Sequence, residues 1–310
     1  MSIDLQNVSK NYGNLQAVKS TGLTIPPHCL FGLIGPDGAG KTTLFRLITT
    51  LLIPETGKIS VFGYDTVKGF RIIRKFTGYM PGRFSLYPDL TVAENLSFYA
   101  TIFGTTIQQH YPIIEPVYSL LEPFRNRLAR NLSGGMKQKL ALSCALIHNP
   151  KLLILDEPTT GVDAVSRKEF WDTLHILKES GMSILVSTPY MDEAARCDRI
   201  AMMQQGEIVV NDTPDAILRG FSKPLFEITS GNRFSILKLL RSWPEVKSAY
   251  LFGHGIHVTM VSEQTGPEWL DRKLKEQGMA DMEISAIQAG FEDCFIEAVD
   301  KNQTNTDRNE

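Results

Sequence analysis

The glycine-rich segment Gly35–Thr42, which reads GPDGAGKT, constrains this chain more than any other part of its sequence. It matches the phosphate-loop pattern G-x-x-x-x-G-K-[ST]. A short apolar run, His28–Ile34, comes directly before it, and apolar residues from Leu44 to Leu51 repeat at helical spacing after it. Because a strand, this loop and a helix in that order are the setting of the pattern, the segment predicts a nucleotide-binding fold. We expect the helix to end at Pro54.

The chemistry of the loop favours a nucleoside triphosphate, namely ATP with Mg²⁺. Glycines let the backbone turn several N–H groups toward phosphate, and the helix N-terminus adds positive potential at the same place. We expect Lys41 to bridge the β- and γ-phosphates and the Thr42 hydroxyl to hold Mg²⁺. The residues expected to contact the phosphates are Gly35, Pro36, Asp37, Gly38, Ala39, Gly40, Lys41, Thr42 and Thr43.

Two acidic residues complete the expected site. Asp156 and Glu157 follow the apolar run Leu152–Leu155, which is typical of a buried strand. We expect Asp156 to hold Mg²⁺, directly or through water, and Glu157 to orient and deprotonate the attacking water. Many strands end in acids, so this pattern carries weight only because the phosphate loop stands upstream.

Strands and helices alternate over the first part of the chain. Apolar runs such as Leu152–Leu155 and Ser183–Ser187, separated by segments of helical spacing, predict an α/β fold whose mainly parallel sheet is covered on both faces. Residues 1–27 alternate like half-exposed strands, and residues 84–150 are expected to be mostly helical. The predicted class is a P-loop NTPase with a parallel-sheet core, an antiparallel β subdomain and a helical subdomain.

The pattern changes after residue 220. A strand–helix–strand–strand–helix–strand order predicts a small ferredoxin-like α+β domain. The expected organisation is a nucleotide-binding domain at 1–220, a small second domain at 221–300 and a polar tail without structure at 301–310. His254 and His257 flank a predicted hairpin, where we expect surface positions rather than metal ligands.

Charge and cysteines limit the function classes. A net charge of −2 gives no general attraction to nucleic acid, and four cysteines far apart in the sequence favour reduced thiols over disulfides or zinc. No apolar run is long enough to span a bilayer, and the first residues lack a signal sequence. We therefore expect a cytoplasmic protein that reaches the cytoplasmic face of the inner membrane through a partner.

Further motifs resemble those of the ATP-binding cassette (ABC) family. The segment Leu132–Met136, LSGGM, is similar to the family's signature motif, and Thr160–Asp163 resembles its D-loop. Tyr12 stands where the family has an aromatic residue that stacks on adenine. These motifs follow the family's order over residues 1–220.

The resemblance implies a partner domain and a membrane protein. In the family two such domains pack head to tail around two ATP molecules, so Ser133, Gly134 and Gly135 are expected to contact the ATP held by the opposite subunit. The run Leu132–Leu140 and the acidic-aromatic segment Phe291–Glu297 are closest in character to exporters with ABC-2-type permeases. Such a permease is expected to dock near residues 79–95. The resemblance also implies that the domain at 221–300 serves regulation or dimer contact.

Two positions depart from the family pattern. Gly82 stands where the family usually has a glutamine, and Pro189 stands where it has the switch histidine. Neither side chain can hydrogen-bond to phosphate or water. Asp37 replaces a common asparagine and adds a carboxylate beside the phosphates. We expect ATP binding to survive and turnover at this chain's own loop to be impaired, with a second, complete cassette on another chain or fused downstream.

Two alternatives to an exporter ATPase remain open. A regulatory module that binds ATP with little turnover is favoured by Gly82 and Pro189. A soluble cassette ATPase unrelated to transport is disfavoured, because the sequence has no basic stretch or nucleic-acid-binding motif.

Overall fold

The computed structural model describes residues 2–83, 86–262, 265–279 and 281–306. The chain divides into two compact units, residues 1–214 with the stretch from 298 onward, and residues 215–297. The boundary after residue 220 that the sequence suggests stays a prediction. No helix within the described residues has the length and apolar character needed to cross a bilayer.

The first unit begins with an antiparallel sheet. Alternating apolar residues bury one face of its two long strands, as expected for half-exposed strands. Its order is β2-β1-β4-β5, with β1 (Ile3–Tyr12), β2 (Leu15–Ile25), β4 (Thr56–Val61) and β5 (Tyr64–Asp65).

The central sheet of this unit has six strands in the order β10-β9-β3-β8-β7-β6. They are β3 (Leu30–Ile34), β6 (Thr77–Met80), β7 (Leu152–Asp156), β8 (Ser183–Thr188), β9 (Arg199–Gln204) and β10 (Glu207–Asp212). All neighbours run parallel except the predicted β9–β10 hairpin. The carboxyl ends of β3, β6, β7 and β8 therefore meet at one edge, where ligands bind in sheets of this kind.

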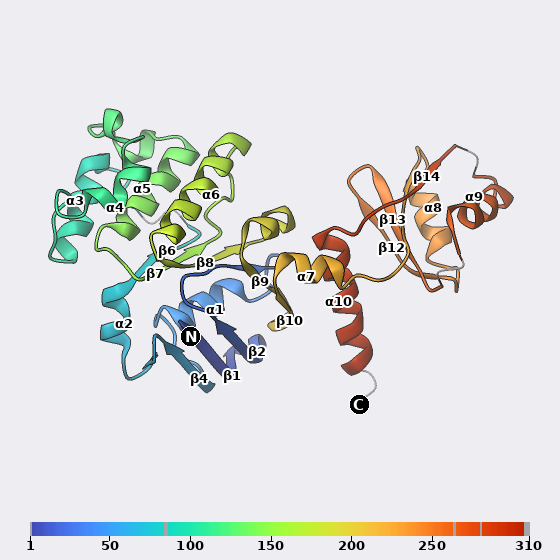
Figure 1. The fold of residues 1–310 in the computed structure, drawn as a ribbon, viewed down its shortest axis with the longest axis horizontal. Coiled ribbons are helices and arrows are strands. Elements are labelled where there is room, and N and C mark those ends of the chain that lie inside the picture. Colours follow the sequence, from blue (N-terminus) through green and yellow to red (C-terminus); the bar gives the residue numbers. More distant parts are fainter. Residues whose placement is uncertain (1, 84–85, 263–264, 280, 307–310) are drawn as a thin grey trace. The chain divides into compact units, whose positions relative to one another are not determined.

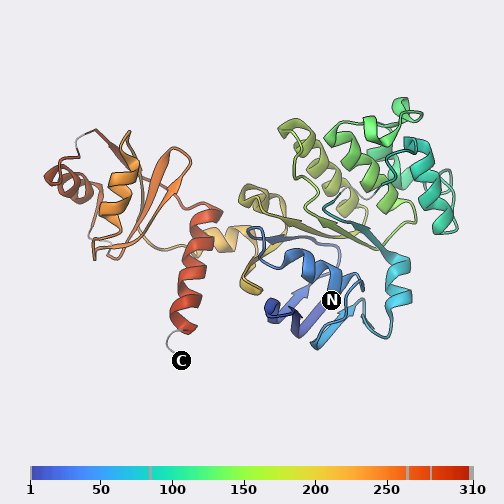
Figure 2. The ribbon, with the colours of Figure 1, turned by 180° about the vertical axis from the view of Figure 1, so that it is seen from behind.

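Helices cover the central sheet (Figure 1). They are α1 (Lys41–Ile48), α2 (Phe70–Phe76), α3 (Val92–Ile102), α4 (Tyr111–Tyr118), α5 (Gly134–Leu146) and α6 (Ala164–Glu179), with short 3₁₀ turns at Glu122–Phe124, Ala129–Asn131 and Met191–Arg196. On one face, α1 and the antiparallel sheet share a core with the strands, around Phe31, Phe45 and Ile154. The predicted helical subdomain corresponds to α3, α4 and α5, which lie together in both ribbon views (Figures 1 and 2).

The first helix is shorter than predicted. It ends at Ile48, well before Pro54, because Thr50 adopts a left-handed conformation with φ 65°. Arg74 stabilises this turn by donating from Nε to Thr50 Oγ1 and from Nη2 to Thr50 O, both at 2.8 Å. A tertiary contact therefore overrides the helical spacing that continued to Leu51.

The second unit has the predicted ferredoxin-like order. Its elements are β11 (Leu225–Thr229), α8 (Arg233–Leu240), β12 (Val246–Phe252), β13 (Gly255–Met260), α9 (Pro267–Glu276), β14 (Glu283–Ala286) and the first part of α10 (Phe291–Thr306). The sheet order is β12-β13-β11-β14, with antiparallel neighbours throughout. Helices α8 and α9 pack their apolar residues on one sheet face. A further short helix, α7 (Pro214–Arg219), spans the unit boundary.

Two expectations for the C-terminal part were wrong. His257 is buried, not at the surface, because its Nδ1 bonds to Asp293 Oδ1 at 2.8 Å and α10 covers it. The tail is helical through Thr306, since an existing helix gains one hydrogen bond with each residue added. Residues 307–310 of the predicted tail lie outside the described residues.

Candidate nucleotide-binding site

The glycine-rich loop joins the carboxyl end of β3 to the first turn of α1, as predicted. Gly40 has φ 106° and precedes the helix, and a Cβ there would collide with the carbonyl oxygen of Ala17 on β2. Only glycine fits this position without strain. The N-terminus of α1 is thereby held against the loop, which directs N–H groups and positive potential to one spot.

Lys41 is fixed at the base of the loop. Its side chain is buried, and Nζ donates to the carbonyl oxygens of Gly35 at 2.8 Å and Pro36 at 3.0 Å. Glu157 Oε1 lies 3.5 Å from the same Nζ. The structure therefore brings together the expected phosphate ligand and the expected general base.

Asp156 and Glu157 are held at the end of β7 by a residue that the sequence analysis missed. Ser187 Oγ donates to Asp156 Oδ1 at 2.6 Å and accepts from Glu157 N at 3.0 Å. Glu157 takes the left-handed conformation, with φ 51°, which is strained for a non-glycine residue. The signal in the sequence was the hydroxyl at the end of the neighbouring apolar run, since β8 lies beside β7.

A cavity of about 590 Å³ opens over the loop. It is lined by Tyr12, Leu15, Gln16, Ala17, Lys19, Gly38, Ala39, Gly40, Lys41, Thr42, Thr43, Glu157, Gln205 and Gly206. The aromatic ring of Tyr12 is half exposed here, where a base could stack on it. The sequence analysis did not foresee Gln205 or Gly206, because the β9–β10 turn reaches the site only through the fold.

The two positions that depart from the family pattern are Gly82 and Pro189. Gly82 lies next to the two acids at the end of β7, and Pro189 lies at the end of β8. A Cβ on Gly82 would be 3.0 Å from Asp156 O and 3.7 Å from Glu157 Cβ, so the glutamine position directly faces the two acids. Pro189 directly follows Thr188 at the end of β8. Thr188 Oγ1 is engaged elsewhere, because it donates to the buried Glu193 Oε2 at 2.5 Å.

The predicted signature segment forms a second, separate feature. Ser133 caps α5, with Oγ accepting from Met136 N at 3.3 Å. A Cβ on Gly135 would lie 2.6 Å from Ser166 Oγ on α6, so glycine permits this close packing. Among the described residues that line the phosphate-loop cavity, none comes from Ser133–Gly135. Those N–H donors are thus available for a ligand other than this chain's own nucleotide.

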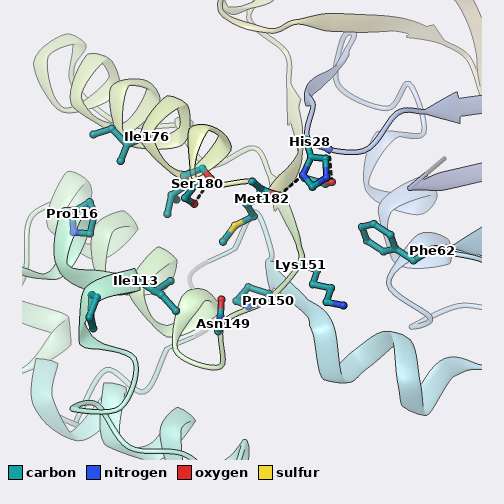
Figure 3. A pocket seen from close by; sticks show the side chains of 14 residues that line it. His28, Phe62, Ile113, Pro116, Asn149, Pro150, Lys151, Ile176, Ser180 and Met182 are labelled. Carbon is teal, nitrogen blue, oxygen red and sulfur yellow. Dashed lines mark hydrogen bonds between the residues drawn. The ribbon is translucent and has the colours of Figure 1, made fainter.

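A larger cavity, of about 700 Å³, lies at the opposite edge of the central sheet. Lys151 and Ser183, which precede or begin β7 and β8, border it together with Ile113 and Ile176 from two helices (Figure 3). His28 borders it too and bonds to the carbonyl of Gly181. None of its described lining residues belongs to the phosphate loop, so its size does not make it the nucleotide site.

The residues around the loop fit Mg²⁺. Asp156 is almost fully buried at 2% exposure, and Thr42 stands in the first turn of α1. A carboxylate and a hydroxyl are hard oxygen ligands, the type that Mg²⁺ prefers when substrate phosphates supply the remainder. Asp156 is in none of the salt bridges of the described residues, so a cation bound there would offset the cost of burying its charge.

Comparison with known proteins identifies the family. A family model described as "ABC transporter" matches residues 18–160. Nod factor export ATP-binding protein I of a Rhizobium species is 32% identical over 300 residues, which cover 96% of this chain and 96% of the relative. The chain belongs to the ABC transporter family of ATP-binding proteins. The cassette therefore binds ATP, while the residue roles assigned above stay predictions.

Other relatives and solved structures agree with this assignment. The probable multidrug ABC transporter ATP-binding protein YbhF of Escherichia coli is 38% identical over 302 residues, covering 95% of the cassette chain but 51% of the relative. The chain thus spans about half the length of that relative. Solved structures include an ATP-binding subunit of an ABC transporter (29% identity, TM-score 0.65, 71% of this chain and 93% of that one). Another is a dimeric post-hydrolysis cassette bound to ADP and Pi (26% identity, TM-score 0.62, 68% and 98%).

Proposed function

We propose that this chain is the ATP-binding subunit of an ABC exporter and couples ATP binding and hydrolysis to transport by a membrane permease of the ABC-2 type. The observation that carries the proposal is the cavity in which Lys41 and Glu157 meet over the phosphate loop. Relatives named for Nod factor export and multidrug transport support the export role. The chain would work at the cytoplasmic face of the membrane.

We propose a task for each residue at the loop. Lys41 Nζ neutralises charge on the β- and γ-phosphates, and Glu157 orients and deprotonates the attacking water. Thr42 and Asp156 would hold Mg²⁺, which spreads the negative charge that develops on the phosphate oxygens. Ser187 keeps the two acids in place through its bonds to both.

Turnover at this loop is proposed to be slow. Gly82 and Pro189 remove two groups that would bind phosphate or water in the transition state, and one such donor typically contributes about 10²–10³ in rate. Ser133–Gly135 are intact and would complete the nucleotide site of a second cassette in a head-to-tail dimer. Support for such pairing comes from the dimeric solved cassette and from the multidrug relative, of which this chain covers 51%.

A groove beside the site suits a permease helix. It has a volume of about 350 Å³ and is lined by Thr49, Leu51, Arg74, Thr77, Tyr79, Met80, Leu86, Tyr99, Phe103, Ala141, Cys144, Ala145 and His148. These residues include the start of the region expected to dock the permease. Burial lowers the pKa of His148 to about 4, so its imidazole is neutral in the groove at physiological pH. An apolar helix face can therefore enter this part of the groove without meeting a charged imidazole.

A second candidate function has one specific observation in its favour. Neither Gly82 nor Pro189 has a side chain able to contact the γ-phosphate, so the chain could bind ATP as a regulatory module with little turnover. The structure offers no equivalent reason to favour a cassette unrelated to transport.

Co-expression with a candidate ABC-2-type permease tests the exporter role. The permease should co-purify with the wild-type chain and with Lys41→Ala, which lies outside the groove, while Lys41→Ala loses most ATP affinity. Leu51→Asp, which places a charge in the groove, should lose the permease but still bind ATP. Full ATP binding without any permease association would favour the regulatory module.

A further inference from the structure

The helix α2 carries a surface that the proposed functions do not use. We propose that Val67, Lys68, Arg71, Ile72 and Lys75, here called the α2 patch, bind the anionic headgroups of a lipid bilayer. The patch lies on the part of the first unit between helices α3–α5 and the antiparallel sheet (Figure 1). It requires neither nucleotide nor permease, so it stands apart from the proposed ATPase role.

Charge is concentrated in this segment. Residues 56–76 contain five lysines and arginines but a single acid, Asp65, whereas the whole chain has a net charge of −2. Asp65 does not face the patch as a free carboxylate, because its Oδ1 accepts from the backbone N–H groups of Val67 and Lys68 at 2.9 Å. The basic character is therefore local and is not a property of the chain as a whole.

The helix geometry turns this charge outward. Ile73 is fully buried and fixes the inner face of α2. At 100° per residue, Arg71 and Lys75 point away from Ile73 and lie one turn apart, with Ile72 beside them. Ile72 and Val67 are each 45% exposed, so apolar side chains stand next to the charges.

No acid in the described part of the chain neutralises the basic side chains of the patch. Lys68, Arg71 and Lys75 take part in none of the salt bridges there, although the guanidinium of Arg71 lies 5.7 Å from the ring centroid of Phe70. Arg74 differs, since both of its hydrogen bonds go to Thr50 and it stabilises the turn after α1. Three cations without an acidic partner, interleaved with exposed aliphatic groups, match the composition of surfaces that bind at the headgroup level of anionic membranes.

The position of the patch agrees with this partner. Arg74 and Leu51 line the groove proposed for the permease, and Arg74 lies between patch residues on the same short helix. A surface next to a membrane-protein contact lies close to the bilayer, where each basic residue strengthens binding about fivefold. Lipid contact would then orient the cassette beneath its permease.

Vesicle co-sedimentation of the full chain tests the proposal without a permease or ATP. Binding should be strong to vesicles of phosphatidylglycerol and phosphatidylcholine in equal parts and weak to pure phosphatidylcholine. It should fall as salt rises, because the contact is screened. The triple change Lys68→Gln, Arg71→Gln, Lys75→Gln should lower partitioning about a hundredfold. Unchanged thermal unfolding and ATP binding would show that this variant is folded.

A matched variant distinguishes the patch from general charge. Arg125→Gln, Arg127→Gln, Lys168→Gln removes the same charge from exposed positions of the same unit and should keep most of the binding. Equal loss in both triple variants, or equal binding to both vesicle types, would overturn the proposal. Loss of permease co-purification by the patch variant with unchanged lipid binding would also overturn it, since the partner would then be an acidic protein segment.

Discussion

At the scale of single residues, the site combines the residues proposed for ATP binding with two positions, Gly82 and Pro189, that lack the side chains proposed for catalysis. Lys41 is held by two carbonyls and lies near Glu157, and Ser187 fixes both acids. Gly82 faces Asp156 and Glu157 without a side chain. Since binding depends on the loop and catalysis on the added donors, the two properties can be separated by mutation.

Restoring the missing groups should raise turnover. Gly82→Gln with Pro189→His should increase the ATP hydrolysis rate of the cassette by about 10²–10³ with little change in ATP affinity. The backbone at residue 82 accepts a side chain, because a Cβ would lie 3.0 Å from Asp156 O and needs only a small shift. Steady-state phosphate release measures the rate. Gly82→Ala with Pro189→Ala is the control, and an equal gain in that variant would contradict the explanation.

Sequence reasoning reached most of these residues but not all. The loop, Lys41 and the two acids are local in sequence, so pattern alone located them. Ser187, Gln205 and Gly206 reach the site from other strands, and nothing in their own neighbourhood marks them. The separation of Ser133–Gly135 from the loop is likewise a property of the fold rather than of the sequence.

At the scale of elements, the start of α10 is tied to the sheet of the second unit by a buried polar cluster. Asp293 Oδ1 accepts from Tyr250 Oη and lies 2.8 Å from His257 Nδ1, while Oδ2 accepts from Gly290 N at 2.7 Å. Burial opposes ionisation of Asp293, but these bonds outweigh it and hold its pKa below the usual value. The sequence analysis did not foresee this cluster, because periodicity cannot reveal a partner on another strand.

Loss of this carboxylate should destabilise the second unit in a pH-dependent way. A depressed folded-state pKa contributes stability above the unfolded pKa of about 3.9, and this stability disappears as pH falls through the folded value. Asp293→Asn should therefore lower the free energy of unfolding by about 1–3 kcal/mol at pH 7, and by much less at a pH below the folded-state pKa of Asp293. Urea unfolding measures this free energy, followed by the fluorescence of Trp243 and Trp269 in a Trp171→Phe background.

A surface carboxylate provides the comparison. Asp271→Asn removes only an exposed i,i+4 pair with Lys275 and should change stability by a few tenths of a kcal/mol, at about 0.3–0.5 for such pairs. A loss of stability in Asp293→Asn that is the same at pH 7 and below pH 3 would contradict a role for the ionised carboxylate.

At the scale of the whole molecule, we propose that the chain supplies parts to two different nucleotide sites. Its own loop, with Lys41 and Thr42, would bind one ATP, and Ser133–Gly135, at the start of α5, would offer their N–H groups to another. The sequence predicted the α/β core and the ferredoxin-like order, since both follow from the spacing of apolar residues along the chain. It could not predict where α1 ends, because Arg74 decides that from a distant helix.

We propose that this chain's own loop binds ATP but hydrolyses it slowly, and the ATP hydrolysis rate of the purified chain tests this proposal. With saturating Mg²⁺ and ATP, we expect tight binding and a low basal rate, which Glu157→Gln lowers further because Glu157 is the proposed general base. Brisk hydrolysis by the purified chain alone would contradict the proposal.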